Sequence, residues 1–336
     1  MKLLAVELRR FFSRRATRWF TAAGAAALLG VLTIVMVNSH SPSPEEWRLA
    51  AEAADRDRAA NRAELSDCRD YWRLHPETVA PYDTPHPRDC LAAYDPSTIR
   101  DSDYLIGVLN LTDELPGQLA VLFLVFSLCG LLITGSFIGA EWSSGGMANL
   151  LLWCPNRGRV FAAKLVAAVI GVLTLTIGYG IIHVGALWGL AAVRGHVGTP
   201  TEEWWWQNLE LAGRVLFIVM LVVCCAAALA MLGRRTVTAV GAVIGYGLVV
   251  EYGFRAVGEA VDVTGEMFTL STYLNAWFDD GMVLHPRYSI NHALDRFGDP
   301  PDAIVISDWA GGAVLSAVTV LLVAVALVVF RKRDVV

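Results

Sequence analysis

The sequence predicts an all-α polytopic membrane protein, on the evidence of its composition, its long apolar runs and the placement of its basic residues. Of its 336 residues, 55% are hydrophobic and only 18% are charged, whereas soluble domains contain about 25% charged residues. A helix of about 20 apolar residues crosses a bilayer. A soluble core would explain one run of about that length, but the chain has six: 19–38, 117–138, 160–193, 211–232, 237–257 and 309–330.

The distribution of basic residues predicts the side of the membrane on which each connection lies. Lysine and arginine accumulate in cytoplasmic connections. Six basic residues precede the first span against a single acid, Glu7, and the run 331–333 is Arg-Lys-Arg. Two further arginines, 234–235, separate spans four and five. The sequence therefore predicts that both termini are cytoplasmic, N-in and C-in, as six spans permit.

The first 38 residues predict a surface helix followed by a retained span. Residues 1–18 mix apolar and basic side chains, a pattern typical of a cytoplasmic interfacial helix; a basic cap on the first span is the alternative. The apolar run of 19–38 is too long for the core of a signal peptide, and no A-x-A cleavage site follows it. We therefore expect this span to remain as an anchor.

The largest predicted extracytoplasmic domain is the segment 39–116. Residues 44–65 are rich in Ala, Glu, Arg and Asp, which predicts an exposed helix beginning near Ser43. The segment has too few apolar residues for a large core, so we expect a small cap on the membrane part. Cys68 and Cys90 lie on the side where disulfides persist, and two unrelated thiols are the alternative.

Two further connections, 194–210 and 258–308, are predicted to be extracytoplasmic loops, and residues 331–336 a cytoplasmic tail. The first loop contains three consecutive tryptophans, 204–206. Tryptophan concentrates at the interface between membrane and water. These side chains are therefore expected to anchor the loop at the interface, with a ligand-stacking site as the alternative.

Charged side chains near the outer ends of two spans are candidate polar sites within the membrane. Glu210 and Arg214 precede span four, and Glu251 and Arg255 lie near the end of span five. The i, i+4 spacing places each pair on one helix face, so we expect ion pairs. Gating or substrate contact is the alternative, because charges inside spans are costly and often functional. His183 in span three is expected to form interhelical hydrogen bonds rather than a proton relay.

The motifs that the chain lacks narrow its chemistry. It has no G-x-x-x-x-G-K-[ST] phosphate loop, no H-E-x-x-H or compact Cys/His cluster, and no G-x-S-x-G elbow. We therefore expect no catalytic residues, no metal ligands and no cofactor in this chain, which would not be an enzyme by itself. Nothing in the sequence predicts nucleic-acid binding.

The connection 139–159 is the most structured of the predicted cytoplasmic segments. No proline interrupts Glu141 to Leu152, and a short amphipathic helix is expected with one face formed by Met147, Leu150, Leu151 and Trp153. Pro155 then ends the helix, because proline disfavours helical geometry in the residue before it. The basic residues that follow, Arg157, Arg159 and Lys164, suit lipid phosphates. The helix would either press on a partner or only reverse the chain.

This segment resembles the permease subunits of ABC-2 type ABC transporters. The family pattern is approximately E-x-x-x-G-T-x-x-x-L-L-x-x-P-x-x-R-x-x-x-x-x-K, and the usual threonine is replaced here by Gly146 or Met147. The plan of six spans, cytoplasmic termini, an N-terminal interfacial helix and a large first outside segment is also similar. The matching positions are Glu141, Gly145 or Gly146, Leu151, Leu152, Pro155, Arg157 or Arg159, and Lys164.

The resemblance implies a subunit of an ATP-driven exporter in the plasma membrane. The 139–159 loop would be a coupling helix seated on a P-loop ATP-binding cassette subunit, which would hold ATP and Mg. The N-terminal helix would face that subunit, and a second permease copy or a paralogue would complete the membrane part. Membrane lipids would surround the complex. The cargo is not implied.

Two other classes of function fit the same sequence. An ion-coupled secondary transporter would need a titratable site within the membrane, for which only Glu251 and His183 are near candidates. A membrane-anchored sensor or assembly protein would instead bind its partner through the 39–116 domain.

Overall fold

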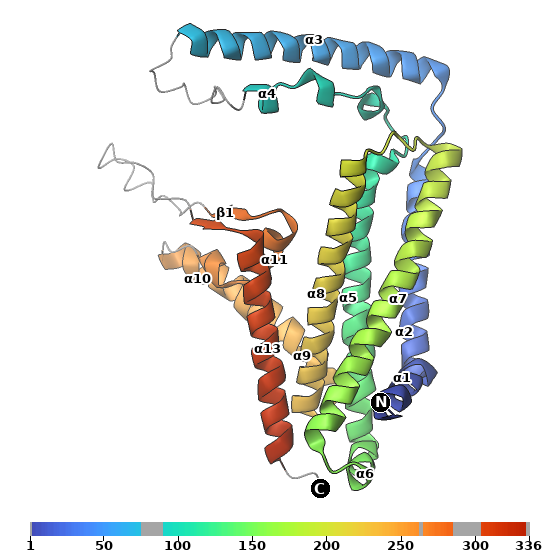
Figure 1. Cartoon of the computed structure of the whole chain (residues 1–336), viewed down its shortest axis with the longest axis vertical. Helices are drawn as coiled ribbons and strands as arrows, with labels where there is room; N and C mark the ends of the chain where they lie inside the picture. Colours follow the sequence, from blue (N-terminus) through green and yellow to red (C-terminus); the bar gives the residue numbers. More distant parts are fainter. Residues whose placement is uncertain (1, 75–89, 262–264, 285–303, 334–336) are drawn as a thin grey trace. The chain divides into compact units, whose positions relative to one another are not determined.

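The computed structural model describes residues 2–74, 90–261, 265–284 and 304–333, and the chain divides into two compact units. Unit 1 contains 1–29, 116–182 and 202–336, and unit 2 contains 30–115 and 183–201. Three long helices, α2 (Arg15–Asn38), α5 (Leu111–Ser143) and α7 (Arg157–Arg194), have a part in each unit. Most of the described chain is helical (Figure 1).

Six helices are long and apolar enough to cross a membrane. Besides α2, α5 and α7 they are α8 (Glu202–Gly233), the fifth span (Thr236–Val257) and α13 (Asp308–Lys332). The helices extend beyond the predicted spans, because those bounds count apolar residues while helix continues through the polar residues beside them. The chain is therefore a multi-pass membrane protein.

The fifth span contains an irregular segment. It consists of α9 (Thr236–Tyr246), the π-helical segment η3 (Gly247–Glu251) and the start of α10 (Tyr252–Val261). Only 6% of its most apolar window is buried within this chain. A π-helical turn adds a residue to the helical repeat and often occurs at functional sites.

Unit 1 has a continuous apolar core made by α1 (Lys2–Ser13), α5, α7, α8 and α13. Phe11 of α1 is fully buried, and its ring lies 5.5 Å from that of Phe137 on α5. The same ring lies against Gly171 of α7, where an added Cβ would lie only 2.4 Å from it. The N-terminal segment is thus a separate helix, and one face of it is packed into the core.

The segment predicted as the loop 258–308 contains regular structure in its described parts. It includes η4 (Gly265–Phe268), α11 (Leu270–Phe278) and two antiparallel strands, β1 (Met282–Leu284) and β2 (Ile304–Ile306), paired with Val283 opposite Val305. The all-α prediction therefore missed a small two-stranded sheet. Nine helical residues and three-residue strands are too short for clear periodicity. Packing against α13 stabilises α11, and packing against α11 and each other stabilises the strands.

Unit 2 is built around α3 (Pro44–Leu74), which is longer than the predicted 44–65 helix. Glu46 accepts hydrogen bonds from the backbone N–H and hydroxyl of Ser43, and Ser43 Oγ accepts from the Glu46 N–H, so the helix begins with a capping box. The backbone hydrogen bond from Ser43, with those from His40 and the Ser43 hydroxyl, lowers the Glu46 pKa from 4.5 to about 2.

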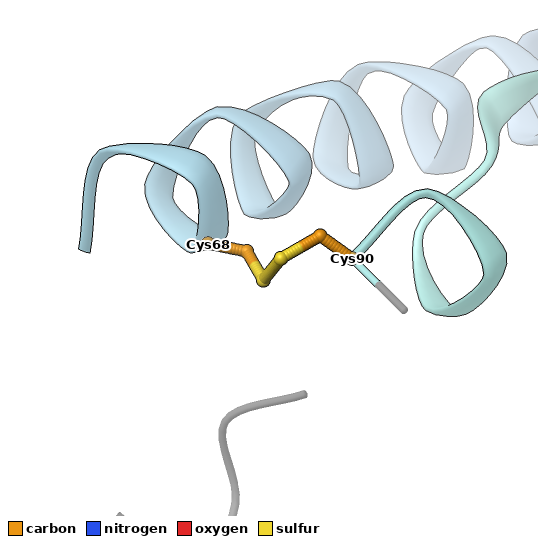
Figure 2. The surroundings of a disulfide bond; sticks show 2 residues. All are labelled: Cys68 and Cys90. Carbon is orange, nitrogen blue, oxygen red and sulfur yellow. A yellow bond between two sulfur atoms is a disulfide. The ribbon is translucent and has the colours of Figure 1, made fainter. Parts of the chain in front are cut away.

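The segment 90–104 packs along α3. Arg58 contacts Asp101 at 2.6 Å and donates to the Ile99 carbonyl, and the Tyr104 hydroxyl donates to Asp57. Cys68 near the end of α3 is joined by a disulfide to Cys90 at the start of α4 (Cys90–Ala93) (Figure 2). The bridge therefore closes a loop of the chain between Cys68 and Cys90, of which residues 75–89 lie outside the described residues.

Candidate functional site

The connection between α5 and α7 contains a short helix, α6 (Gly146–Trp153). Gly145 precedes it with φ of 71°, in the left-handed region that glycine adopts without a Cβ clash. Pro155 follows it, and the Asn156 side chain accepts a hydrogen bond from Arg159 N–H at the start of α7. The helix therefore begins at Gly146, and Glu141 belongs to the last turns of α5 rather than to the short helix as predicted.

The apolar side chains of α6 divide between a packed face and an exposed end. Met147 is 1% exposed, and Leu150 and Leu151 pack partly against the unit 1 core. Leu152 and Trp153, by contrast, are 82% and 83% exposed. The predicted face was therefore wrong at Trp153, which joins Leu152 in an exposed apolar pair. Large exposed apolar side chains that are adjacent often mark a contact site.

A cluster of four charged side chains lies where α1, α5 and α7 meet. Lys164 Nζ is 2.8 Å from Glu7 Oε2 and 2.5 Å from Glu141 Oε2. Arg14 contacts Glu141 Oε1 at 2.7 Å and donates to the Ser136 carbonyl. We call Glu7, Arg14, Glu141 and Lys164 the buried charge cluster. With two acids and two bases, it carries no net charge.

Burial makes these contacts mutually dependent. Lys164 and Glu7 are fully buried and Glu141 is 6% exposed. Removing ions from water costs several kcal/mol each, and their attraction offsets that cost only with good geometry and further partners. The Phe137 ring lies 5.1 Å from both Arg14 Cζ and Lys164 Nζ, so both cations also face an aromatic ring. The cluster therefore joins three helices at one point.

Sequence reasoning placed two members of this cluster in a different role. Glu141 and Lys164 were expected to bind a partner, and Lys164 to suit lipid phosphates. Their burial leaves neither carboxylate nor ammonium open to a partner or a lipid in this structure, because each already contacts opposite charges inside the chain. Glu7 and Arg14 were missed. The one signal was that Glu7 is the single acid among six basic residues at the start of the chain.

The two arginines at the start of α7 have different surroundings. Arg157 donates to the carbonyls of Phe330, Arg331 and Arg333 at the end of α13. Carbonyls at a helix C-terminus attract cations, so Arg157 holds α7 to α13. Arg159 is exposed, and Pro155 is exposed as well.

A comparison with protein families identifies the family of this chain. A family model described as an ABC-2 family transporter protein matches residues 11–335. The chain belongs to the ABC-2 transporter family. The match includes the cluster residues Arg14, Glu141 and Lys164, all of α6 and all six spans. No curated protein matches the chain.

ABC-2 permeases are membrane components of transporters and generally associate with an ATP-binding cassette subunit. The described residues of this ABC-2 chain include no group of three or more His, Cys, Asp or Glu side chains arranged to hold a metal ion. The features open to a partner at the α6 connection include the Leu152–Trp153 pair, Pro155 and Arg159.

The opposite ends of the spans in this ABC-2 chain carry a second polar cluster. Arg214 of α8 contacts Glu210 at 2.7 Å, as predicted from the spacing, and also Asp280 at 2.5 Å. It donates to the Trp277 carbonyl at the end of α11. The Glu210–Arg214 pair is thus part of a larger contact that holds α11 against α8.

The second predicted pair does not form. Among the contacts of the described residues, Glu251 and Arg255 do not touch each other, and both bind Ser271. The Ser271 N–H and hydroxyl donate to the two carboxylate oxygens of Glu251, and Arg255 donates to Ser271 Oγ. The spacing argument failed here because the N-terminus of α11 supplies donors that compete for the carboxylate.

Proposed function

We propose that this chain is the permease subunit of an ATP-driven exporter in the plasma membrane, and that α6 transmits movement from an ATP-binding cassette subunit. The observation that carries the proposal is the exposed Leu152–Trp153 pair, at the end of a helix held between two spans. Docking this pair in an apolar cleft would remove its surface from water. ATP and Mg would be bound by the partner alone.

The contacts of α6 support a direct transfer of movement. Gly145 connects it to α5 and the Pro155–Asn156 turn connects it to α7. The buried charge cluster holds these two spans and α1 together beside the connection. A displacement of α6 would therefore move α1, α5 and α7 as one group. A partner that contacts α6 differently in its open and closed states would shift the balance between two states of the spans.

The proposed topology follows from the charges. Both termini and α6 would lie in the cytoplasm, and the 39–116 segment would lie outside. A second permease copy or a paralogue would cover surface that is open in the single chain, such as the sparsely buried fifth span.

The contacts of Glu251 give little support to an ion-coupled transporter. Both of its carboxylate oxygens accept hydrogen bonds from Ser271, at 3.1 Å and 2.6 Å. Glu251 therefore caps the start of α11 from the fifth span. This contact favours a structural role for Glu251, which is the best-placed titratable group of that span.

The test replaces one member of the exposed pair. Leu152→Asp is expected to reduce binding of the cognate ATP-binding subunit by about 30-fold or more, since a buried apolar anchor at an interface contributes about 2 kcal/mol or more. Co-purification from membranes and substrate-stimulated ATP hydrolysis measure this effect. Leu49→Asp is the control, because Leu49 is also an exposed leucine, 51% against 82%, but lies on α3. Unchanged binding and hydrolysis in Leu152→Asp would refute the assigned role.

A further inference from the structure

A cavity of about 720 Å³ lies in unit 1 among α5, α8, the fifth span, α11 and α13. Most of its lining is apolar, including Leu128, Leu221 and Val318. Binding sites for small molecules have volumes of about 300–1,000 Å³ and are mainly apolar, with a few convergent polar groups. The cavity has the size and lining of such a site.

Three polar residues of the lining meet at the end of the cavity where α11 begins. Glu251, Arg255 and Ser271 all line it. Both oxygens of Glu251 are occupied by donors from Ser271, whereas Arg255 makes one hydrogen bond, to Ser271 Oγ. A guanidinium group has five N–H donors. Within the described part of the chain, this end therefore offers donors and few acceptors to an incoming group.

The local backbone supports a site at the same place. The π-helical segment Gly247–Glu251 forms one wall, and its first and last residues both line the cavity. Segments of this kind are often retained at functional sites although they weaken the regular hydrogen-bond pattern. The cavity, the spare donors and the irregular helix are three separate observations about one location.

We propose that this cavity binds a membrane phospholipid, with an acyl chain against the apolar lining and the phosphate at Arg255. A phosphate oxygen is an acceptor that matches the planar donors of arginine. The site lies among spans, so a ligand from the bilayer reaches it without crossing water. This binding does not depend on the ATP-binding subunit or on α6.

The test titrates the purified full-length chain, in non-ionic detergent, with two fluorescent lipids. One is phosphatidylglycerol, and the other is diacylglycerol with the same labelled acyl chains. The two lipids differ only in that diacylglycerol lacks the phosphate-containing headgroup. Fluorescence anisotropy measures the dissociation constant of each. The wild-type chain is expected to bind phosphatidylglycerol more tightly than diacylglycerol.

Three substitutions separate the contribution of the lipid headgroup from that of the acyl chains. Arg255→Gln is expected to weaken phosphatidylglycerol binding about tenfold or more and leave diacylglycerol binding unchanged, as for loss of one charge-assisted hydrogen bond. Arg255→Lys should retain part of the preference. Val318→Trp fills the cavity and should weaken both lipids.

The matched controls are Arg235→Gln and Val320→Trp. Arg235 is exposed at the start of α9, and Val320 is 66% exposed on α13, and neither lines the cavity. Both variants should bind like the wild type. The proposal is wrong if Arg255→Gln keeps the wild-type preference, if Arg235→Gln loses it equally, or if Val318→Trp binds both lipids normally. The last two results would indicate general surface attraction of lipid.

Discussion

The side chain of Lys164 lies between two carboxylates from helices that are far apart in sequence. Glu7 precedes the first span, and Glu141 ends the second. Because this ammonium group is fully buried, water cannot replace a carboxylate that it loses. The contacts of Lys164 therefore matter mainly because, without its ammonium group, the buried Glu7 and Glu141 would each keep one cation, Arg10 at 3.3 Å and Arg14 at 2.7 Å.

This argument predicts the cost of removing the lysine. Lys164→Met is expected to lower the free energy of unfolding by about 3–5 kcal/mol, as for other buried ion pairs that lose one member. Glu7→Gln combined with Lys164→Met should recover a large part of that loss, because one of the two buried acids is then neutral and the other, Glu141, still contacts Arg14. Circular dichroism during denaturant unfolding in detergent micelles measures both variants.

The exposed Arg48–Glu52 pair on α3 provides the control. Its atoms are 2.6 Å apart, but both side chains are more than half exposed. Glu52→Gln should therefore change stability by less than about 1 kcal/mol. If the single and double variants at the buried cluster differ no more than that, the cluster does not stabilise the contact between α1 and α7 as described.

At the scale of an element, α6 depends on the left-handed residue before it. Gly145 links α5 to α6. Apart from Gly145 and its two chain neighbours, no described residue has an atom within 4 Å of the place that an added Cβ would take, so the backbone angle is the constraint there. Gly146 lies within the helix and has no such angle. The two adjacent glycines are therefore not equivalent.

The matched substitutions are Gly145→Ala and Gly146→Ala. A non-glycine residue in the left-handed region costs about 1–3 kcal/mol, so Gly145→Ala should tilt α6 and lower substrate-stimulated ATP hydrolysis about fivefold or more. Gly146→Ala should leave it near the wild-type level, because alanine favours helix. Equal effects of the two would show that the backbone angle at Gly145 does not position α6.

At the scale of the whole molecule, labelling of the cysteines tests the proposed topology. Cys68 and Cys90 form a disulfide in unit 2, while Cys154 is free and partly exposed just after α6. If unit 2 faces outward, a reductant that cannot cross the membrane should open the disulfide in intact cells. An impermeant maleimide should then label Cys68 and Cys90 but reach Cys154 only after permeabilisation.

Mass spectrometry of the labelled peptides identifies each site, and Cys154→Ser confirms the assignment of the inner label. Labelling of Cys154 in intact cells, with no reaction at Cys68 and Cys90, would reverse the proposed orientation. This labelling experiment determines the orientation of the chain without a transport assay.

The sequence predicted the spans well because each is a local property: about 20 apolar residues identify a span without knowledge of its neighbours. The Glu210–Arg214 pair was predictable for the same reason. Glu7 and Lys164 are separated by 157 positions in sequence, and no local pattern relates them. The exposure of Trp153 also escaped prediction, because it depends on where α6 ends and how its other face packs.

The position of Lys164 has a consequence for how the chain is made. Lys164 lies in the first turns of α7, which is synthesised after α1, and burying a lysine ammonium without a counter-ion opposes insertion. Its counter-ion Glu7 has by then already left the ribosome ahead of the first span. The N-terminal helix thus supplies the negative charge that a later segment needs. A chain made without its first thirteen residues would have to insert this lysine with one of its two acids missing.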